Sequence, residues 1–340
     1  MLRTMHVSHT TGLIVFVAAV LTIALAALAY TLAWMGRKLR RKSEPQRSTL
    51  AKWTRRDVLA LAGGGAACIA WGGIFEPYRL EVTHTRIVTT KLRGADRPVR
   101  IVHISDMHCD PKLRNEPKLP GVIADLKPDV IVYTGDSINS PEGLSNFRRC
   151  LTDIAKIAPV YAVRGNWDVR IRVLPDYFDD IENVTELNGS NQRIEAAGTH
   201  LWVCGAAVMD GLRLDQRNEL LAHATDVPKE DFKLFLYHYP DLVYSLAEFG
   251  VDLHCAGHTH GGQVAMPFYG ALLTASKYGK RFEAGLYPIE RKKPEPNMHL
   301  YVNRGIGMEG DAPRVRFWCR PEVSLIELVP AGSLATDKHG

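Results

Sequence analysis

Short apolar runs alternate with segments of helical periodicity through most of this chain, and this pattern strongly limits the folds it can adopt. Residues 119–126 and 144–157 have the periodicity of helices. Residues 76–98 read as one or two edge strands, residues 184–206 are rich in strand and turn signals, and two more strands are expected at 300–302 and 323–329. Buried strands alternating with helices predict an α/β layered fold. The compact apolar runs are residues 99–104, 129–134, 159–163, 232–237 and 251–256.

Each compact run is followed by side chains that bind metal ions. Because the carboxyl ends of successive strands lie along one edge of an α/β sheet, we expect these side chains to meet. A single aspartate after a strand is more often a helix cap, but five such strand ends in order predict a metal site. In chain order the side chains are Asp106 and His108, Asp136, Asn166 and Asp168, His238, and His258 and His260.

The last of these strand ends carries the sequence Gly-His-Thr-His-Gly-Gly-Gln at residues 257–263. Two imidazoles one residue apart can reach one ion only if the backbone turns sharply, and glycine permits such a turn because it adopts positive φ at little cost. The alternative is a polar loop whose histidines only cap a strand. With the other strand ends as partners, the segment favours metal coordination.

Taken together, Asp106-x-His108, Gly135-Asp136, Gly165-Asn166-x-Asp168, His238 and Gly257-His258-x-His260 resemble the motifs of calcineurin-like metallophosphoesterases. The resemblance runs from about residue 99 to residue 329. Segments 261–263, 278–282, 284–287 and 301–307 carry a narrower likeness to its membrane-linked or twin-arginine-exported branch. That branch includes phosphodiesterases and a lipid A-pathway pyrophosphatase that cleaves UDP-2,3-diacylglucosamine. The resemblance implies a four-layer α/β/β/α sandwich that hydrolyses phosphodiester or pyrophosphate bonds.

The same resemblance implies a centre with two divalent metal ions, for which manganese, iron and zinc all suit the mixed nitrogen and oxygen ligands. Two cations roughly 3.5–4 Å apart can activate water and clamp a phosphoryl oxygen. We assign catalysis to three residues of this centre, Asp136, Asn166 and His260. In the implied ligand set, Asp106, His108 and His260 hold one ion, Asn166, His238 and His258 hold the other, and Asp136 bridges them.

One position departs from the family pattern, because Trp167 stands where the family usually has a histidine thought to protonate the leaving oxygen. Indole donates a hydrogen bond but cannot deliver a proton near neutral pH. Two hypotheses stay open: the enzyme cleaves a phosphoanhydride, whose leaving group needs little protonation, or the chain binds metal with little or no catalysis. Lys280, Arg281 and Arg304, together with Trp167, are candidates for contact with a substrate phosphate, although loop cations are more often solvated.

The N-terminal region predicts attachment to a membrane. Residues 12–34 are almost purely apolar, and a span needs about 20 residues, so residues 1–35 are a predicted transmembrane anchor. Lysines and arginines are concentrated at residues 37–56, next to this anchor. The net charge of +5 is therefore local and favours a membrane surface over nucleic acid, for which we expect no binding. The expected substrate is a phosphate-containing lipid, either a phospholipid or a UDP-2,3-diacylglucosamine-type precursor.

Residues 36–75 combine the basic linker with a second apolar run that begins after Thr54-Arg55-Arg56-Asp57. The run resembles a twin-arginine export signal, and a second transmembrane helix is the alternative; both place residues 76–330, the predicted catalytic domain, outside the cytoplasm. A surface-lying segment would leave that domain at the cytoplasmic face, which is the side where a UDP-linked lipid is made. Residues 331–340 form a polar tail. The six cysteines lack metal or disulfide spacing. Cys68 lies in the apolar run, and the other five are expected as buried thiols.

Overall fold

The computed structural model describes residues 55–266, 268–291, 296–310 and 314–331 of the 340-residue chain. The predicted anchor at residues 1–35 and nearly all of the basic linker and polar tail lie outside these residues. None of the helices in the described ranges has both the length and the apolar character that a bilayer crossing requires.

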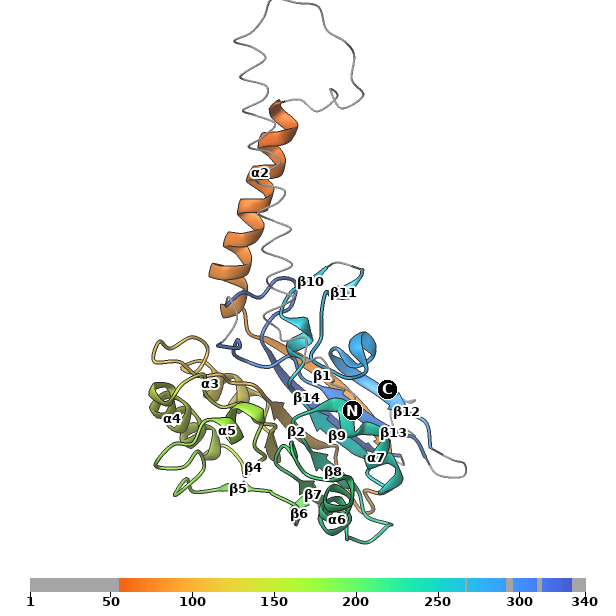
Figure 1. Cartoon of the computed structure of the whole chain (residues 1–340). Coiled ribbons are helices and arrows are strands. Elements are labelled where there is room, and N and C mark those ends of the chain that lie inside the picture. Colours follow the sequence, from red (N-terminus) through yellow and green to blue (C-terminus); the bar gives the residue numbers. More distant parts are fainter. Residues whose placement is uncertain (1–54, 267, 292–295, 311–313, 332–340) are drawn as a thin grey trace, which may run out of the picture.

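Two six-stranded mixed sheets form the centre of the molecule (Figure 1). The first contains, in spatial order, β1 (Glu81–Thr89), β14 (Glu322–Pro330), β2 (Val99–Ile104), β3 (Val130–Tyr133), β4 (Val160–Ala162) and β5 (Val184–Glu186). The second contains β12 (Gly285–Ile289), β13 (Met298–Val302), β9 (Leu253–Ala256), β8 (Lys233–Leu236), β7 (Thr199–Gly205) and β6 (Ser190–Ala196). β2 to β5 run parallel, as do β13, β9, β8 and β7.

The strands are buried on both faces, which explains why they read as continuous apolar runs without alternation. In β3, Ile131 and Tyr133 belong to one apolar cluster, whereas Val130 and Val132 belong to another. Successive side chains of a strand point to opposite faces, so the first sheet separates two cores. One core lies between the two sheets, and the other lies between the first sheet and its helices.

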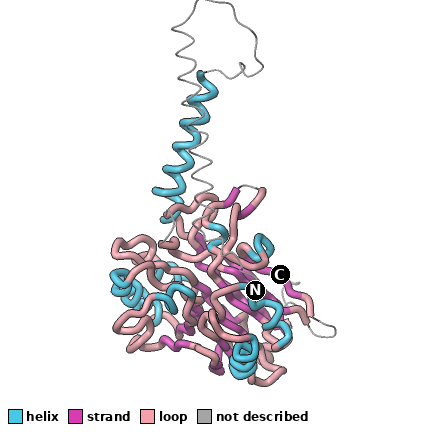
Figure 2. The backbone as a smooth tube through the Cα atoms, in the orientation of Figure 1, coloured by secondary structure: helices cyan, strands magenta, loops and turns pink. Residues whose placement is uncertain are grey.

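Helices cover the outer face of each sheet, as the tube drawing shows (Figure 2). The first sheet is covered by α3 (Leu119–Asp125) and α4 (Leu144–Ala155), and the second by α6 (Leu214–Ala224) and α7 (Val243–Glu248). The order helix, sheet, sheet, helix confirms the predicted α/β sandwich. Five short helices lie in the connections between these elements: η4 (Pro141–Gly143), α5 (Asn166–Arg170), η5 (Pro240–Leu242), η6 (His260–Gly262) and η7 (Gly279–Phe282).

The apolar run that follows the arginine pair is helical. It forms α2 (Arg55–Ala70), η2 (Trp71–Phe75) and η3 (Glu76–Tyr78), and α2 projects away from the body (Figure 1). The helical segment is attached to the body at η2, where the Gly72 carbonyl accepts the Arg316 backbone N–H at 2.9 Å. Nearby, β10 (Ala265–Met266) and β11 (Gly270–Ala271) form a small separate hairpin. Five cysteines are buried free thiols, as expected, and Cys68 on α2 is exposed.

Candidate metal centre

The predicted ligands come from strand ends of both sheets. Asp106 and His108 follow β2, Asp136 follows β3, and Asn166 begins α5 just after β4, so the first sheet supplies four of them. His238 follows β8, and the pair His258 and His260 follows β9 in the second sheet. The parallel strands of each sheet end at the same edge, and the packing of the two sheets brings these edges together.

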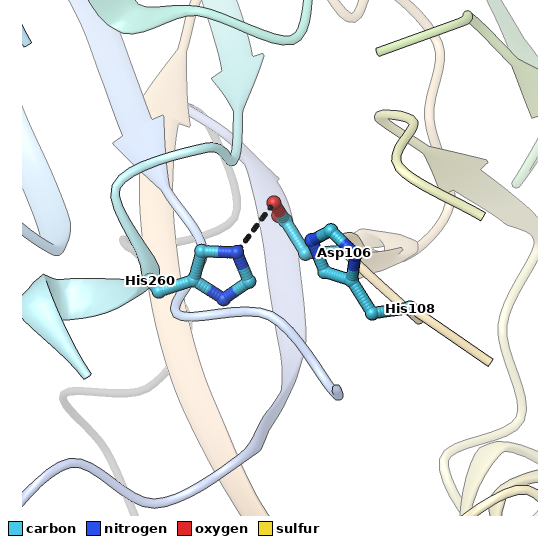
Figure 3. Close-up of side chains that lie close together, drawn as sticks. All are labelled: Asp106, His108 and His260. Atoms are coloured by element: carbon cyan, nitrogen blue, oxygen red, sulfur yellow. Dashed lines mark ion pairs between the residues drawn. The ribbon is translucent and has the colours of Figure 1, made fainter. Parts of the chain in front are cut away.

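The first group consists of Asp106, His108 and His260, whose ligand atoms lie within 4.8 Å of one another (Figure 3). His260 Nε2 is 3.3 Å from Asp106 Oδ1. All three side chains are almost completely buried. One carboxylate and two imidazoles converging on one point form a ligand set for a borderline divalent cation.

The second group consists of Asp136, His238 and His258, again with ligand atoms within 4.8 Å of one another. Asp136 Oδ2 lies 3.2 Å from His238 Nε2 and 3.5 Å from His108 Nε2, which belongs to the first group. One carboxylate oxygen therefore faces both groups, which is the position that a bridging ligand needs.

Several buried ligand atoms have no hydrogen-bond partner among the described residues. These atoms are His108 Nε2, His238 Nε2 and Asn166 Oδ1. Buried polar atoms are nearly always paired, so atoms left in this way at one point fit cation ligands. His238 Nδ1 donates to the Thr134 carbonyl at 2.7 Å, which fixes the ring and leaves the Nε2 lone pair for a cation. The residues present thus fit two divalent cations.

The pKa shifts of the two carboxylates, Asp106 and Asp136, also favour bound cations. Burial raises the pKa of Asp106 to about 7, and the Asp136 carboxylate contributes to this rise although His238 opposes it. Burial alone would raise the pKa of Asp136 as well, but the surrounding imidazoles of His238, His108 and His258 hold it well below its usual value. Two buried carboxylates this close to each other are stabilised by positive charge placed between them.

The backbone at the ligands is strained in a consistent way. Asp106, His108, Asp136, His258 and His260 have φ values between 41° and 68°. Non-glycine residues rarely adopt this left-handed region, and each such residue costs of order 1–3 kcal/mol. We expected the glycines to supply the turn after β9. Gly261 and Gly262 do have positive φ, but the ligands adopt it themselves, which turns each side chain back over the strand end.

The Asp168 carboxylate ties two ligand-bearing loops together. It accepts the backbone N–H groups of Asp136 and Ser137, both at 2.8 Å, and that of Gly165 at 2.9 Å. Asp168 therefore holds the loops after β3 and β4 and does not face the cations. The close approach of these loops needs glycine, because a Cβ at Gly165 would overlap the Asp136 side chain.

Trp167 forms a wall of the site and is buried. Its ring meets His108 edge-on at a centroid distance of 5.4 Å, and the Arg170 guanidinium lies over it at 3.9 Å. The other three candidates for substrate contact lie elsewhere. Arg304 is bound by Glu322 and Glu81 at 2.7 and 2.8 Å, so its guanidinium is already neutralised.

Lys280 and Arg281 lie on η7, beside aromatic rings. Lys280 Nζ is 3.4 Å from the centre of the Tyr269 ring in the β10–β11 turn, and Arg281 lies over Tyr244 and Phe282 at 5.7 and 5.5 Å. The first contact places Lys280 next to the hairpin, whereas Arg281 lies beside α7 through Tyr244.

Sequence reasoning missed Arg316, whose side chain is completely buried. Its guanidinium donates to the carbonyls of Arg304, Gly305 and Gly307. Gly305 lies against the Asp106 side chain, and Gly307 lies against His108. Arg316 therefore supports the floor of the metal centre. An arginine in a loop carries no signal that separates this role from a solvated cation.

Two sheets whose edges hold two facing groups of cation ligands with a shared carboxylate form a dinuclear metal centre of the kind that phosphoester hydrolases use. The family model described as calcineurin-like phosphoesterase matches residues 99–262. The chain therefore carries a calcineurin-like metallophosphoesterase domain and uses two divalent metal ions.

Curated relatives extend the match over most of the chain. The uncharacterized metallophosphoesterase YkuE of Bacillus subtilis is 28% identical, with 82% of this chain and 99% of the relative covered. The UDP-2,3-diacylglucosamine pyrophosphatase LpxG of Chlamydia trachomatis is 26% identical, covering 75% and 91%. The phosphodiesterase YaeI of Escherichia coli is 28% identical, covering 75% and 90%.

Proposed function

We propose that this metallophosphoesterase hydrolyses a phosphoanhydride in a lipid-linked substrate of the UDP-2,3-diacylglucosamine type. The observation that carries the proposal is Trp167, which closes the metal centre at the position where we expected the family's proton donor. General acid help is typically worth 10²–10⁴-fold, and a phosphate leaving group needs it least. The likeness to a pyrophosphatase that acts on a lipid-linked nucleotide supports the same substrate class.

In this scheme the protein residues orient the reacting groups. Bound cations supply a polarised phosphoryl oxygen and an activated water. Asp136 holds the two cation sites at a fixed separation, and the Thr134 carbonyl fixes the tautomer of His238. The buried Trp167 indole keeps water from one side of His108 and has no proton to give near neutral pH.

The test is the dependence of turnover on the leaving group. The full chain with manganese is assayed on phosphoesters and anhydrides whose leaving groups span a wide range of pKa. We expect kcat/KM to fall steeply as the leaving-group pKa rises. Trp167→His should flatten this dependence and raise turnover of alkyl esters, by up to about 10²–10⁴-fold, with little effect on the anhydride.

Two controls make the result decisive. Trp167→Phe keeps an aromatic wall without a titratable group and should retain the steep dependence. Asp136→Asn removes the shared charge and should abolish turnover of every substrate. A flat dependence in the unmodified chain would reject the leaving-group argument. Metal binding without turnover of any substrate would leave a metal-binding protein.

We also propose that the domain is attached to the membrane and lies outside the cytoplasm, on the basis of residues 12–34 and the arginine-flanked run after them. A UDP-linked precursor is made at the cytoplasmic face, so a domain on the outer face would act on the phosphoanhydride of another lipid that reaches that face, whereas a domain on the cytoplasmic face would act on the UDP-linked lipid itself. A reporter fused after residue 340 decides between the faces. Alkaline phosphatase activity of the fusion supports the outer face, and fluorescence of a fused green fluorescent protein without such activity supports the cytoplasmic one.

A further inference from the structure

Large apolar side chains gather on the face where α2 joins the body. Phe268, at the turn of the β10–β11 hairpin, is fully exposed, and Trp318 is 64% exposed. Contiguous exposed apolar surface of this kind is uncommon on soluble proteins and marks an interaction site. We call the following six residues the apolar rim: Ile74, Phe75, Met266, Phe268, Tyr269 and Trp318.

Backbone hydrogen bonds make the rim one surface, although its residues come from three segments. The Arg316 N–H donates to the Gly72 carbonyl at 2.9 Å, which joins the segment before Trp318 to η2. The Phe317 N–H donates to the Gln263 carbonyl, and the Ala265 N–H donates to the Phe317 carbonyl, both at 2.9 Å. Residues 316–318 therefore lie between η2 and the hairpin, and all three segments meet beside the lower end of α2 (Figure 1).

The rim is built onto the loop that carries the metal ligands. The Cys319 thiol, next to Trp318, donates to the His260 carbonyl at 3.0 Å. On the hairpin side, the Glu283 carboxylate accepts the Ala271 N–H at 2.8 Å, and the Glu283 carbonyl accepts the Thr259 hydroxyl at 2.7 Å. Thr259 lies between the two histidines of the metal centre. The segments that carry the rim are therefore joined by hydrogen bonds to the loop that holds His258 and His260.

We propose that the apolar rim lies in the headgroup region of a lipid bilayer, so that a lipid-linked substrate reaches the metal centre without leaving the membrane. This inference rests on the proposed function for the choice of a lipid. Trp and Tyr side chains concentrate at membrane interfaces, and the rim contains one of each, Trp318 and Tyr269. Lys280, whose Nζ lies 3.4 Å from the centre of the Tyr269 ring, supplies positive charge for anionic headgroups.

The course of the chain favours a bilayer over a second copy of the protein. The 54 residues that precede α2 contain the apolar run at residues 12–34 and a cluster of basic residues. They are joined in sequence to α2, whose lower end reaches the body beside the rim (Figure 1). An anchor of this kind holds the rim near the membrane and raises its effective concentration there.

The experiment measures the depth of the rim in vesicles of phosphatidylcholine and phosphatidylglycerol. The full chain with Cys68→Ser, which removes the exposed thiol, receives a spin label through Phe268→Cys or Trp318→Cys. We expect both labels to lose accessibility to a water-soluble nickel chelate and to gain accessibility to oxygen when vesicles are added. The matched control is Leu214→Cys, which is 74% exposed on α6, at the far end of the molecule from the hairpin (Figure 1). Its label should not change.

Two results would overturn the proposal. Labels at positions 268 and 318 that stay as accessible to nickel as the label at 214 would show that the rim does not meet the bilayer. Protection that grows with protein concentration in the absence of vesicles would show that a second copy covers the rim.

Activity separates this proposal from the proposed function. Phe268→Ser combined with Trp318→Ser should lower turnover of a vesicle-borne lipid anhydride by about tenfold, since two large apolar side chains leave the interface. Turnover of water-soluble bis-p-nitrophenyl phosphate should stay unchanged. An equal loss on both substrates would reject the rim, whereas an unmodified chain with no turnover of either substrate would reject the proposed function.

Discussion

Replacing Arg316 with methionine is expected to loosen the floor of the metal centre. The side chain is completely buried, and all of its nitrogens donate to backbone carbonyls. These bonds join the loop after β13, at residues 304–307, to residues 316–319, which include Trp318 of the apolar rim. The acceptors are the carbonyls of Gly307 at 2.6 and 3.0 Å, Arg304 at 2.8 Å, Gly305 at 3.1 Å and Cys319 at 3.3 Å.

The expected loss of stability follows from the carbonyls that would lose their donor. Methionine fills much of the same space but has no donor, so the carbonyls of Arg304, Gly307 and Cys319 lose the bonds that Arg316 makes. The Gly305 carbonyl still accepts the Glu322 N–H at 3.0 Å. An unsatisfied buried carbonyl costs about 1–3 kcal/mol, and removing a buried cation offsets part of the total. We expect the loop to lose about 3–6 kcal/mol of local stability.

Hydrogen exchange of the metal-loaded full chain measures this loss. The Ile306 and Gly307 N–H groups donate to the Ser105 and Asp106 carbonyls at 3.0 and 2.7 Å, so their exchange reports opening of the floor. A loss of 3 kcal/mol corresponds to at least about 100-fold faster exchange, since 1.4 kcal/mol is tenfold. Strand β7 should not change. Arg320→Met is the matched control, because Arg320 is partly exposed and pairs only loosely with Glu81 at 3.7 Å. Unchanged exchange at Ile306 and Gly307 in Arg316→Met would refute the reasoning.

Two further substitutions test the packing of the site and of the sheets. Gly257→Ala places a Cβ against Ser105 Oγ and Asp106 Oδ2, so metal affinity measured by calorimetry should fall by about tenfold or more. Gly121→Ala, on α3 with open space around its Cβ, should leave the affinity unchanged. Equal affinities of the two variants would contradict the predicted overlap. Burial lowers the pKa of both His103 and His254 from 6.5 to about 3. The unfolded chain therefore binds more protons between these values, and the free energy of unfolding should fall as pH drops from about 6.5 towards 3, by up to about 1.4 kcal/mol per pH unit for each histidine. His254→Phe should remove one such contribution in urea unfolding across this range, and an unchanged acid dependence would show that His254 is not the titrating group.

The alternation of short apolar runs and helices was enough to predict the strands that carry the ligands, because strands buried on both faces consist almost entirely of apolar residues. The ligand residues were also visible, since aspartate, asparagine and histidine recur directly after these strands. Sequence reasoning could not show that Arg304 is neutralised by Glu322 and Glu81. Those carboxylates are distant in sequence and meet Arg304 only through the pairing of β1 with β14.

The backbone conformation of the metal ligands was a second feature that the sequence could not predict. Histidine and aspartate in the left-handed region are unfavourable locally, so no local preference predicts them. They persist because tertiary contacts hold them. The His258 N–H, for example, donates to both carboxylate oxygens of Asp106 at 3.1 and 3.2 Å. The ligands of the two sheets therefore fix each other, and this strain is a product of the assembled fold.

The contacts of η2 and η3 bear on whether the N-terminal segment stays attached. Glu76 is buried, and its carboxylate accepts the Cys319 N–H at 2.6 Å and the Trp71 indole N–H at 2.7 Å. Cleavage after Gly72 would remove Trp71 and the Gly72 carbonyl, and the Arg316 N–H would lose its acceptor beside the metal centre. We therefore expect η2 to remain part of the mature protein, so that no cleavage separates Trp71 and Gly72 from the body. The intact mass of the protein from membranes tests this expectation, and a mature chain that begins after Gly72 would contradict it.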